Sequence, residues 1–151
     1  MSDFEGLSSE DQKLLLSAKA TSARAYAPYS GFGVGAAVRS RRGFIYAGAN
    51  MENASYGTTL CAECAALSAA LAAADFEVET IAIIGGHLDG HRGSNAVITP
   101  CGRCRQLIFE AAQVARLDTR VICANMDLSE VLVTTISELL PHGFGAKDPA
   151  E

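Results

Sequence analysis

The sequence predicts an α/β domain in which a mixed sheet is covered by helices. The 151 residues suffice for one domain with a sizeable core, and 49% hydrophobic against 19% charged residues indicate a compact globular protein. Apolar segments with helical spacing alternate with short apolar runs typical of strands. No repeat or linker interrupts them, so we expect a single domain over residues 1–151, with loose tails at about 1–8 and 146–151.

The expected elements follow from periodicity and from the breakers between them. Leu14, Leu15 and Ala18 continue a helix that begins near Ser8 and ends before the turn at Pro28. After it the sequence predicts a hairpin of strands 34–39 and 44–49, a helix 61–74, strands 79–84 and 96–99, a helix 100–115, a strand 120–124 and a helical turn at 136–140. Residues 87–94 are polar and glycine-rich and are expected to form a loop. This order gives a mixed sheet layered with helices.

Composition and charge exclude several classes of partner. The net charge of −5 and the lack of any Lys/Arg cluster argue against nucleic acid. No apolar run is long enough to span a bilayer, so no membrane partner is expected. The acidic, polar N-terminus does not resemble a signal peptide, which favours a cytoplasmic location. Thiols stay reduced there, and clustered cysteines more often bind metal or react than form disulfides. A small-molecule ligand fits these observations best.

Four of the five cysteines form two pairs, Cys61 with Cys64 and Cys101 with Cys104. Two such C-x2-C pairs are typical of a zinc site, so one Zn²⁺ per subunit is expected. Both pairs open predicted helices. In the second helix Thr99 is the expected N-cap and Pro100 the first helical residue. The free N–H groups of such a helix start stabilise thiolates.

Glu63 is the only charged residue of the predicted helix 61–74, which reads CAECAALSAALAAA. A helix without a polar face is expected to be buried, here between the sheet and another subunit. Burial raises the pKa of a carboxyl group, so Glu63 is the best candidate for proton transfer. A capping box is excluded because position 60 is leucine, whereas a simple interaction with the helix dipole stays open.

The number of cysteine ligands separates a structural site from a catalytic one. With Cys64 as fourth ligand the zinc is saturated, whereas three thiolates leave a position for water. The gap between Cys64 and Cys101 is longer than the roughly 15–20 residues usual in zinc ribbons, which favours the open site. A closed four-cysteine module that serves assembly is the alternative.

Several motifs together resemble the cytidine deaminase family, the small homotetrameric zinc enzymes of pyrimidine nucleoside salvage. The resemblance covers about residues 10–145 in the family's order. Its motifs are Tyr29-Ser30-x-Phe32-x-Val34-Gly35-Ala36, Asn50-Met51-Glu52-Asn53-Ala54-Ser55-Tyr56-Gly57, Cys61-Ala62-Glu63, Pro100-Cys101-Gly102-x-Cys104-Arg105-Gln106 and Leu139-Leu140-Pro141-x-x-Phe144.

The resemblance implies a three-layer α-β-α fold and a homotetramer with active sites near subunit interfaces. It implies zinc-dependent hydrolysis of cytidine and deoxycytidine to uridine and deoxyuridine plus ammonia. Zinc is then held by Cys61, Cys101 and Cys104, and Glu63 is the catalytic proton carrier. The implied substrate contacts are Phe32, Asn50, Glu52, Ala54, Tyr56, Ala62 and Phe144, the last donated by a neighbouring subunit. For Phe32 and Tyr56, ordinary core packing is the alternative.

One position departs from the family's pattern. Many members carry arginine where this chain has Cys64, and that arginine offsets the negative charge of three zinc-bound thiolates. We therefore expect Cys64, Arg103 and Arg105 to lie beside the ligands, with the arginines and the helix N–H groups compensating the charge. A deaminase of a cytosine-nucleoside antibiotic such as blasticidin S is a rival activity, although Asn50 and Glu52 favour a nucleoside.

Overall fold

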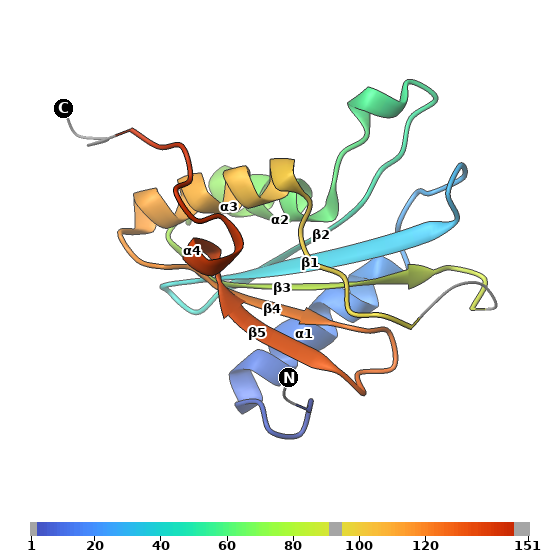
Figure 1. The fold of residues 1–151 in the computed structure, drawn as a ribbon, viewed down its shortest axis with the longest axis horizontal. Coiled ribbons are helices and arrows are strands. Elements are labelled where there is room, and N and C mark those ends of the chain that lie inside the picture. Colours follow the sequence, from blue (N-terminus) through green and yellow to red (C-terminus); the bar gives the residue numbers. More distant parts are fainter. Residues whose placement is uncertain (1–2, 91–94, 147–151) are drawn as a thin grey trace.

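A computed structural model describes residues 3–90 and 95–146 of the chain (Figure 1). The helices within these residues are α1 (Ser9–Ser22), η1 (Tyr56–Thr58), α2 (Ala62–Ala72), α3 (Gly102–Ala115) and α4 (Ile136–Leu139). The strands are β1 (Phe32–Ser40), β2 (Ile45–Ala49), β3 (Val78–His87), β4 (Arg120–Ala124) and β5 (Val131–Thr135). None of the described helices combines the length and the apolar character needed to cross a membrane.

The strands form one mixed sheet in the order β2-β1-β3-β4-β5. The β3–β4 pair is parallel, and the other pairs are antiparallel. Helix α1 covers one face of the sheet, while α2 and α3 lie side by side on the other (Figure 1). The predicted α/β class and its three layers are therefore confirmed.

The side chains of each strand alternate between the two faces of the sheet, and each face forms a hydrophobic core with the helices that cover it. In β3, Ile81 and Ile83 belong to the core under α2 and α3, whereas Ala82 and Ile84 belong to the core under α1. All four side chains are fully buried. Successive residues of a strand point to opposite faces, so a strand covered on both sides is apolar throughout. This is why residues 81–84 of β3 appear in the sequence as a continuous apolar run.

The register of the sheet brings two helix connections to one end. β1 starts at Phe32, which pairs with His87 near the end of β3, and Gly35 pairs with Ala49 at the end of β2. The chain leaves β2 toward α2 and leaves β3 toward α3. Both connections therefore depart from the same end of the sheet, on either side of the start of β1. The cysteine pairs lie where these connections become helices.

Close packing fixes α2 on the sheet. A Cβ atom on Gly48 of β2 would lie 2.5 Å from the Cβ atom of Ala65 and 2.6 Å from the backbone nitrogen of Ala66. Only glycine permits this approach of helix to strand. The position of α2, and with it the direction of Glu63, is thus set by contact between backbones.

A buried ion cluster joins α1 to the sheet. Asp11 is 1% exposed, and its carboxylate accepts hydrogen bonds from Arg39 of β1, at 3.0 Å, and from Arg120 of β4. Arg39 also donates to the Thr80 hydroxyl of β3, at 3.0 Å. Burial alone raises the pKa of Asp11, but the hydrogen bonds from Arg120 and Arg39 outweigh it and hold the pKa below its ordinary value of 3.8.

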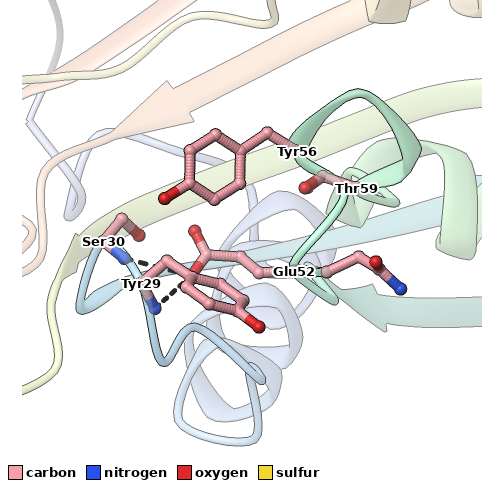
Figure 2. A pocket seen from close by; sticks show the side chains of 6 residues that line it. Tyr29, Ser30, Glu52, Tyr56 and Thr59 are labelled. Atoms are coloured by element: carbon pink, nitrogen blue, oxygen red, sulfur yellow. Dashed lines mark hydrogen bonds between the residues drawn. The ribbon is translucent and has the colours of Figure 1, made fainter.

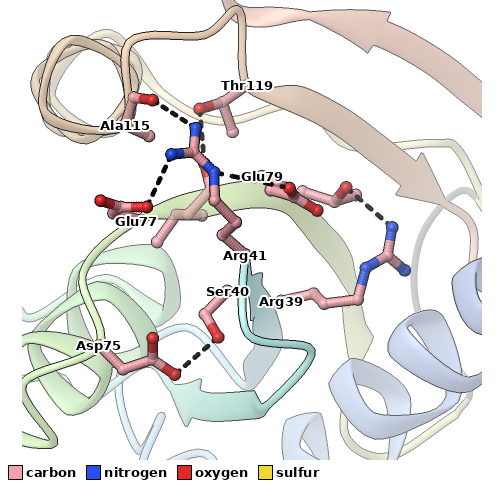
Figure 3. A network of polar contacts seen from close by, with 10 residues as sticks. Arg39, Ser40, Arg41, Asp75, Glu77, Glu79, Ala115 and Thr119 are labelled. Carbon is pink, nitrogen blue, oxygen red and sulfur yellow. Dashed lines mark hydrogen bonds and ion pairs between the residues drawn. The ribbon is translucent and has the colours of Figure 1, made fainter.

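A second polar network lies at the C-terminal end of β1 (Figure 3). Arg41 donates to the Glu77 carboxylate at 2.8 Å and to the Ala115 carbonyl at the end of α3 at 2.7 Å. The Ser40 hydroxyl donates to Asp75 at 2.6 Å, and this bond holds the pKa of Asp75 below its usual value. The network ties the ends of β1, α2 and α3 together at a distance from the cysteines.

The structure corrects several expected elements. Residues 96–99 form no strand, and β5, which the sequence reading missed, pairs with β4 at the sheet edge. β3 continues through the two glycines at 85 and 86 to His87, because glycines on a covered strand still pair through their backbones. Leu7 is buried, so residues 3–8 are not a loose tail, while 1–2 and 147–151 lie outside the described residues.

Candidate metal centre and active site

Three of the five cysteines converge. The sulfur atoms of Cys61, Cys101 and Cys104 lie within 4.8 Å of one another. Cys61 and Cys101 are the N-cap residues of α2 and α3. Tetrahedral zinc with bonds of about 2.3 Å requires sulfurs about 3.8 Å apart, which this cluster accommodates. The residues present therefore fit a zinc ion with three cysteine ligands.

Helix α3 starts later than the sequence predicts. Cys101 is its N-cap in place of Thr99, and Pro100 lies before the helix. The Thr99 hydroxyl accepts a hydrogen bond from Arg105 at 3.2 Å, so it does not cap the helix. The extended backbone at Cys101 directs its sulfur toward Cys61 of the other helix.

Cys64 stands apart from this cluster. Cys64 and Cys104 occupy equivalent places, each three residues after an N-cap cysteine, yet only Cys104 approaches the other helix's N-cap. Cys64 instead lines a cavity of about 180 Å³ between α2 and α3, together with Leu67 and Leu107. The geometry thus groups three thiols and leaves a fourth position for a different ligand.

Burial and mutual repulsion oppose ionisation of all three thiols in the absence of a cation. Cys104 is fully buried, and burial raises its pKa; burial also raises the pKa of Cys61. For Cys101 burial acts in the same direction, but hydrogen bonds from the backbone and thiol of Cys104 outweigh it and lower the pKa. Three thiolates at this spacing repel one another unless a metal binds them, and soft thiolate donors suit zinc.

Glu63 shares a cavity with two of the cysteines. Its side chain is buried, and burial raises the pKa of its carboxyl group, as the sequence predicts. The cavity has a volume of about 190 Å³ and is called the inner cavity below. Its lining residues are Val34, Asn50, Thr59, Cys61, Ala62, Glu63, Ile98, Thr99 and Cys101. A desolvated carboxyl group beside a metal site can both accept and donate a proton.

A second, more open cavity of about 300 Å³ adjoins the first (Figure 2). It is lined by Tyr29, Ser30, Glu52, Asn53, Tyr56 and Thr59 and is called the outer cavity below. Thr59 lines both cavities, so they are neighbours. Thr59 was not predicted as a site residue from the sequence, although it is a polar residue only two positions before Cys61. The rings of Tyr29 and Tyr56 meet edge to face with centroids 5.6 Å apart.

Glu52 organises the wall of the outer cavity. Its Oε1 accepts hydrogen bonds from the backbone N–H groups of Tyr29, at 3.0 Å, and Ser30, at 3.1 Å (Figure 2). Hydrogen bonds from Ser30 lower the pKa of Glu52, which keeps the side chain ionised. The outer cavity therefore presents a carboxylate between two tyrosine rings.

Asn50 is held rigidly in the inner cavity. Its Oδ1 accepts from the Val34 N–H at 2.8 Å, and its Nδ2 donates to the Phe32 carbonyl at 3.0 Å. Both ends of the amide are thus used to fix the start of β1. The Phe32 ring packs edge to face against His87, with centroids 5.2 Å apart, and lines neither cavity.

Three other expected contact residues lie on segments outside the sheet and the main helices. Tyr56 is 74% exposed and lies with Ala54 on the arm between β2 and α2, which projects from the sheet (Figure 1). Phe144 is 84% exposed on the segment after α4. Ala54 and Phe144 line neither cavity within one chain.

The two arginines near the ligands make backbone contacts. Arg105 donates to the carbonyl groups of Pro100 and Leu139, each at 2.8 Å, and so holds the segment that carries Cys101. Arg103 donates to the Thr59 carbonyl at 3.4 Å, across from α3 to the segment before α2. The two arginines therefore anchor the segments that lead into α2 and α3 and also place positive charge near the cysteines.

Comparisons with known proteins match this site and its scaffold. The family model of the cytidine and deoxycytidylate deaminase zinc-binding region matches residues 8–123, which contain the three clustered cysteines and Glu63. A cytidine deaminase of Halalkalibacterium halodurans is 41% identical over 126 residues, which cover 82% of this chain and 86% of that protein. A cytidine deaminase of Mycobacterium tuberculosis is 36% identical over 132 residues, 83% of each protein.

Solved structures agree with the sequence comparison. The crystal structure of a cytidine deaminase from Burkholderia pseudomallei has a TM-score of 0.76 at 41% identity and covers 87% of this chain and 97% of that one. That of a cytidine deaminase from Mycobacterium tuberculosis has a TM-score of 0.72 at 33% identity, with coverages of 92% and 100%.

Proposed function

Because this chain belongs to the family defined by the cytidine and deoxycytidylate deaminase zinc-binding region, we propose that it hydrolyses cytidine and deoxycytidine to uridine and deoxyuridine and releases ammonia. The observation that carries the proposal is the shared cavity of Glu63 with the cysteine cluster. Relatives named cytidine deaminases support the substrate class. The proposed role is pyrimidine salvage from free nucleosides in the cytoplasm.

Cys61, Cys101 and Cys104 would hold the zinc, and bound zinc supplies the Lewis acidity that makes a water molecule nucleophilic at neutral pH. Glu63 takes the proton that this water loses and delivers it to N3 of the cytosine ring. The oxygen of this water bonds to C4, and Glu63 carries the second proton of that oxygen to the C4 amino group; the C4–N bond then breaks, ammonia leaves and the C4 carbonyl of the uracil ring forms. Glu63 can serve both steps because it lies in the inner cavity without joining the thiol cluster.

The two cavities suit the two parts of a nucleoside. The base fits the inner cavity, where Ala62 and the fixed amide of Asn50 form part of the wall. The sugar then reaches the outer cavity, where the Glu52 carboxylate can accept a hydrogen bond from a ribose hydroxyl and Tyr56 flanks it. A contact to the 3′-hydroxyl accepts ribose and deoxyribose alike.

We further propose that the active form is a homotetramer whose sites lie near subunit interfaces. Leu71 of α2 is 60% exposed in one chain, next to the apolar cavity that contains Cys64. The projecting Tyr56 and Phe144 also expose large aromatic surfaces. Exposed apolar surface of this kind is typical of association between subunits.

Zinc content and turnover of two cysteine variants test the site. We expect Cys61→Ala to lose zinc and the conversion of cytidine to uridine, because it removes one of three ligands. Cys64→Ala is expected to keep one zinc per chain and measurable turnover. Metal analysis and ultraviolet absorbance of cytidine measure the two properties. Equal loss of zinc in both variants would show that the site is closed by four cysteines. Absence of uridine formation by the zinc-loaded wild type would overturn the proposed activity.

A further inference from the structure

The segment after α4 is fastened to α3, the helix that supplies two of the three cysteines. It runs from α4 past α3 (Figure 1). Gln106 of α3 donates a hydrogen bond from Nε2 to the Phe144 carbonyl, at 2.7 Å. Arg105, the preceding residue, donates to the Leu139 carbonyl at the end of α4. Two consecutive side chains of α3 thus hold the end of α4 and the segment that follows it.

The ring of Phe109 in α3 packs against the same segment. Gly143 and Gly145, on either side of Phe144, lie against the ring of Phe109. An added Cβ would lie 3.0 Å from this ring at Gly143 and 2.9 Å from it at Gly145, so a side chain at either position would require the ring to shift. The chain is redirected just before them at His142, whose φ of 58° is left-handed.

These contacts fix the backbone of Phe144 but not its ring. The glycines lie against Phe109 of α3, while the Phe144 side chain is 84% exposed. The exposed ring on a held backbone is therefore available for contact with a second chain. The hydrogen bond from Gln106 lies at the residue that carries this ring.

We propose that Gln106 is a positioning residue that sets the place of the Phe144 ring, which closes over the nucleoside bound by a second copy of this chain. The inference rests on the proposed deaminase function and on Phe144 acting across a subunit interface. Gln106 acts only through Phe144, since its amide is engaged with the Phe144 carbonyl and lines neither cavity. Its loss therefore affects substrate binding more than the chemical step.

Steady-state kinetics with cytidine test this role. Gln106→Met keeps the length of the side chain and removes the donor, so we expect KM to rise about three- to tenfold with a smaller change in kcat. Phe144→Ala is expected to raise KM at least as much, and the double variant to resemble Phe144→Ala alone. Gln113→Met is the matched control. It makes the same change on the same helix, and Gln113 makes no side-chain hydrogen bond within the described residues, so KM should stay at the wild-type value.

A spectroscopic test is independent of activity. The chain contains no tryptophan, so Phe144→Trp introduces a single fluorescent reporter. Adding Gln106→Met to this variant is expected to lower the tryptophan anisotropy, and adding Gln113→Met is not. Unchanged anisotropy with Gln106→Met, or additive effects of Gln106→Met and Phe144→Ala on KM, would overturn the inference. If the wild type does not deaminate cytidine, the proposed function fails, whereas the anisotropy still decides whether Gln106 holds Phe144.

Discussion

Glu63→Gln is expected to lower kcat for cytidine by about 10²- to 10⁴-fold while the variant retains one zinc per chain. Glutamine has the shape of glutamate but cannot carry a proton between water and substrate. The Glu63 side chain is buried, so bulk water does not readily take the place of the lost carboxyl group. Glu63 lies outside the cluster of three thiols, so its loss leaves the metal ligands in place. Uridine formation and zinc content, measured on one preparation, check both parts.

A matched glutamate gives the control for this prediction. Glu130→Gln makes the same chemical change at an exposed position before β5, and it should leave kcat and zinc content unchanged. Loss of zinc from Glu63→Gln would show that Glu63 holds the metal site together. Wild-type kcat in Glu63→Gln would mean that another group transfers the proton.

Asp11→Ala has the largest expected effect on stability, a fall of about 3–5 kcal/mol in the free energy of unfolding at neutral pH. Asp11 is buried between Arg39 and Arg120, and its removal leaves the Arg39 guanidinium, only 14% exposed, without its carboxylate. Urea denaturation of the two proteins measures the difference. Glu10→Gln, which changes an exposed acidic neighbour in the same helical turn, should shift stability by no more than about 0.5 kcal/mol.

The contribution of Asp11 should vanish in acid. Its pKa is lower in the folded chain than its ordinary value of 3.8, so the unfolded chain binds more protons as the pH falls through that range. The stabilisation is therefore fully present above about pH 5 and decreases below it, as the pH approaches the lower folded-state pKa. Wild type and Asp11→Ala should converge in stability at low pH. An equal difference at neutral and acidic pH would contradict the ion cluster as its source.

The sequence predicts most of the fold because its strongest signals are periodic. The buried faces of α1 and α3 repeat with helical spacing, and β3 is apolar because both of its faces are covered. β5 was missed because four of its five residues are only half-buried at the sheet edge, although four of the five residues 131–135 are β-branched, which is a strand signal. Residues 96–99 have strand-like composition but no ladder partner.

The candidate site was predictable in its residue types and less so in its arrangement. Cysteine spacing and the lone glutamate indicated a metal centre with a proton carrier. Whether Cys64 or Cys104 joins the cluster of thiols depends on which side of each helix faces the other helix. The spacing of the cysteines in the sequence does not specify this. Thr99 was wrongly expected to cap α3, because Arg105 takes its hydroxyl through a contact that only the folded chain forms.

The origin of the ligands from two separate helix starts makes the site a reporter of folding. Cys61 and Cys101 are forty positions apart along the chain and meet because β2 and β3 end beside the start of β1. An unfolded chain offers no such trio, so zinc stabilises the folded state by its preference for that state. Metal affinity is therefore thermodynamically coupled to strand pairing. Substitutions in the core of the sheet, far from every thiol, are therefore expected to change the affinity of the protein for zinc.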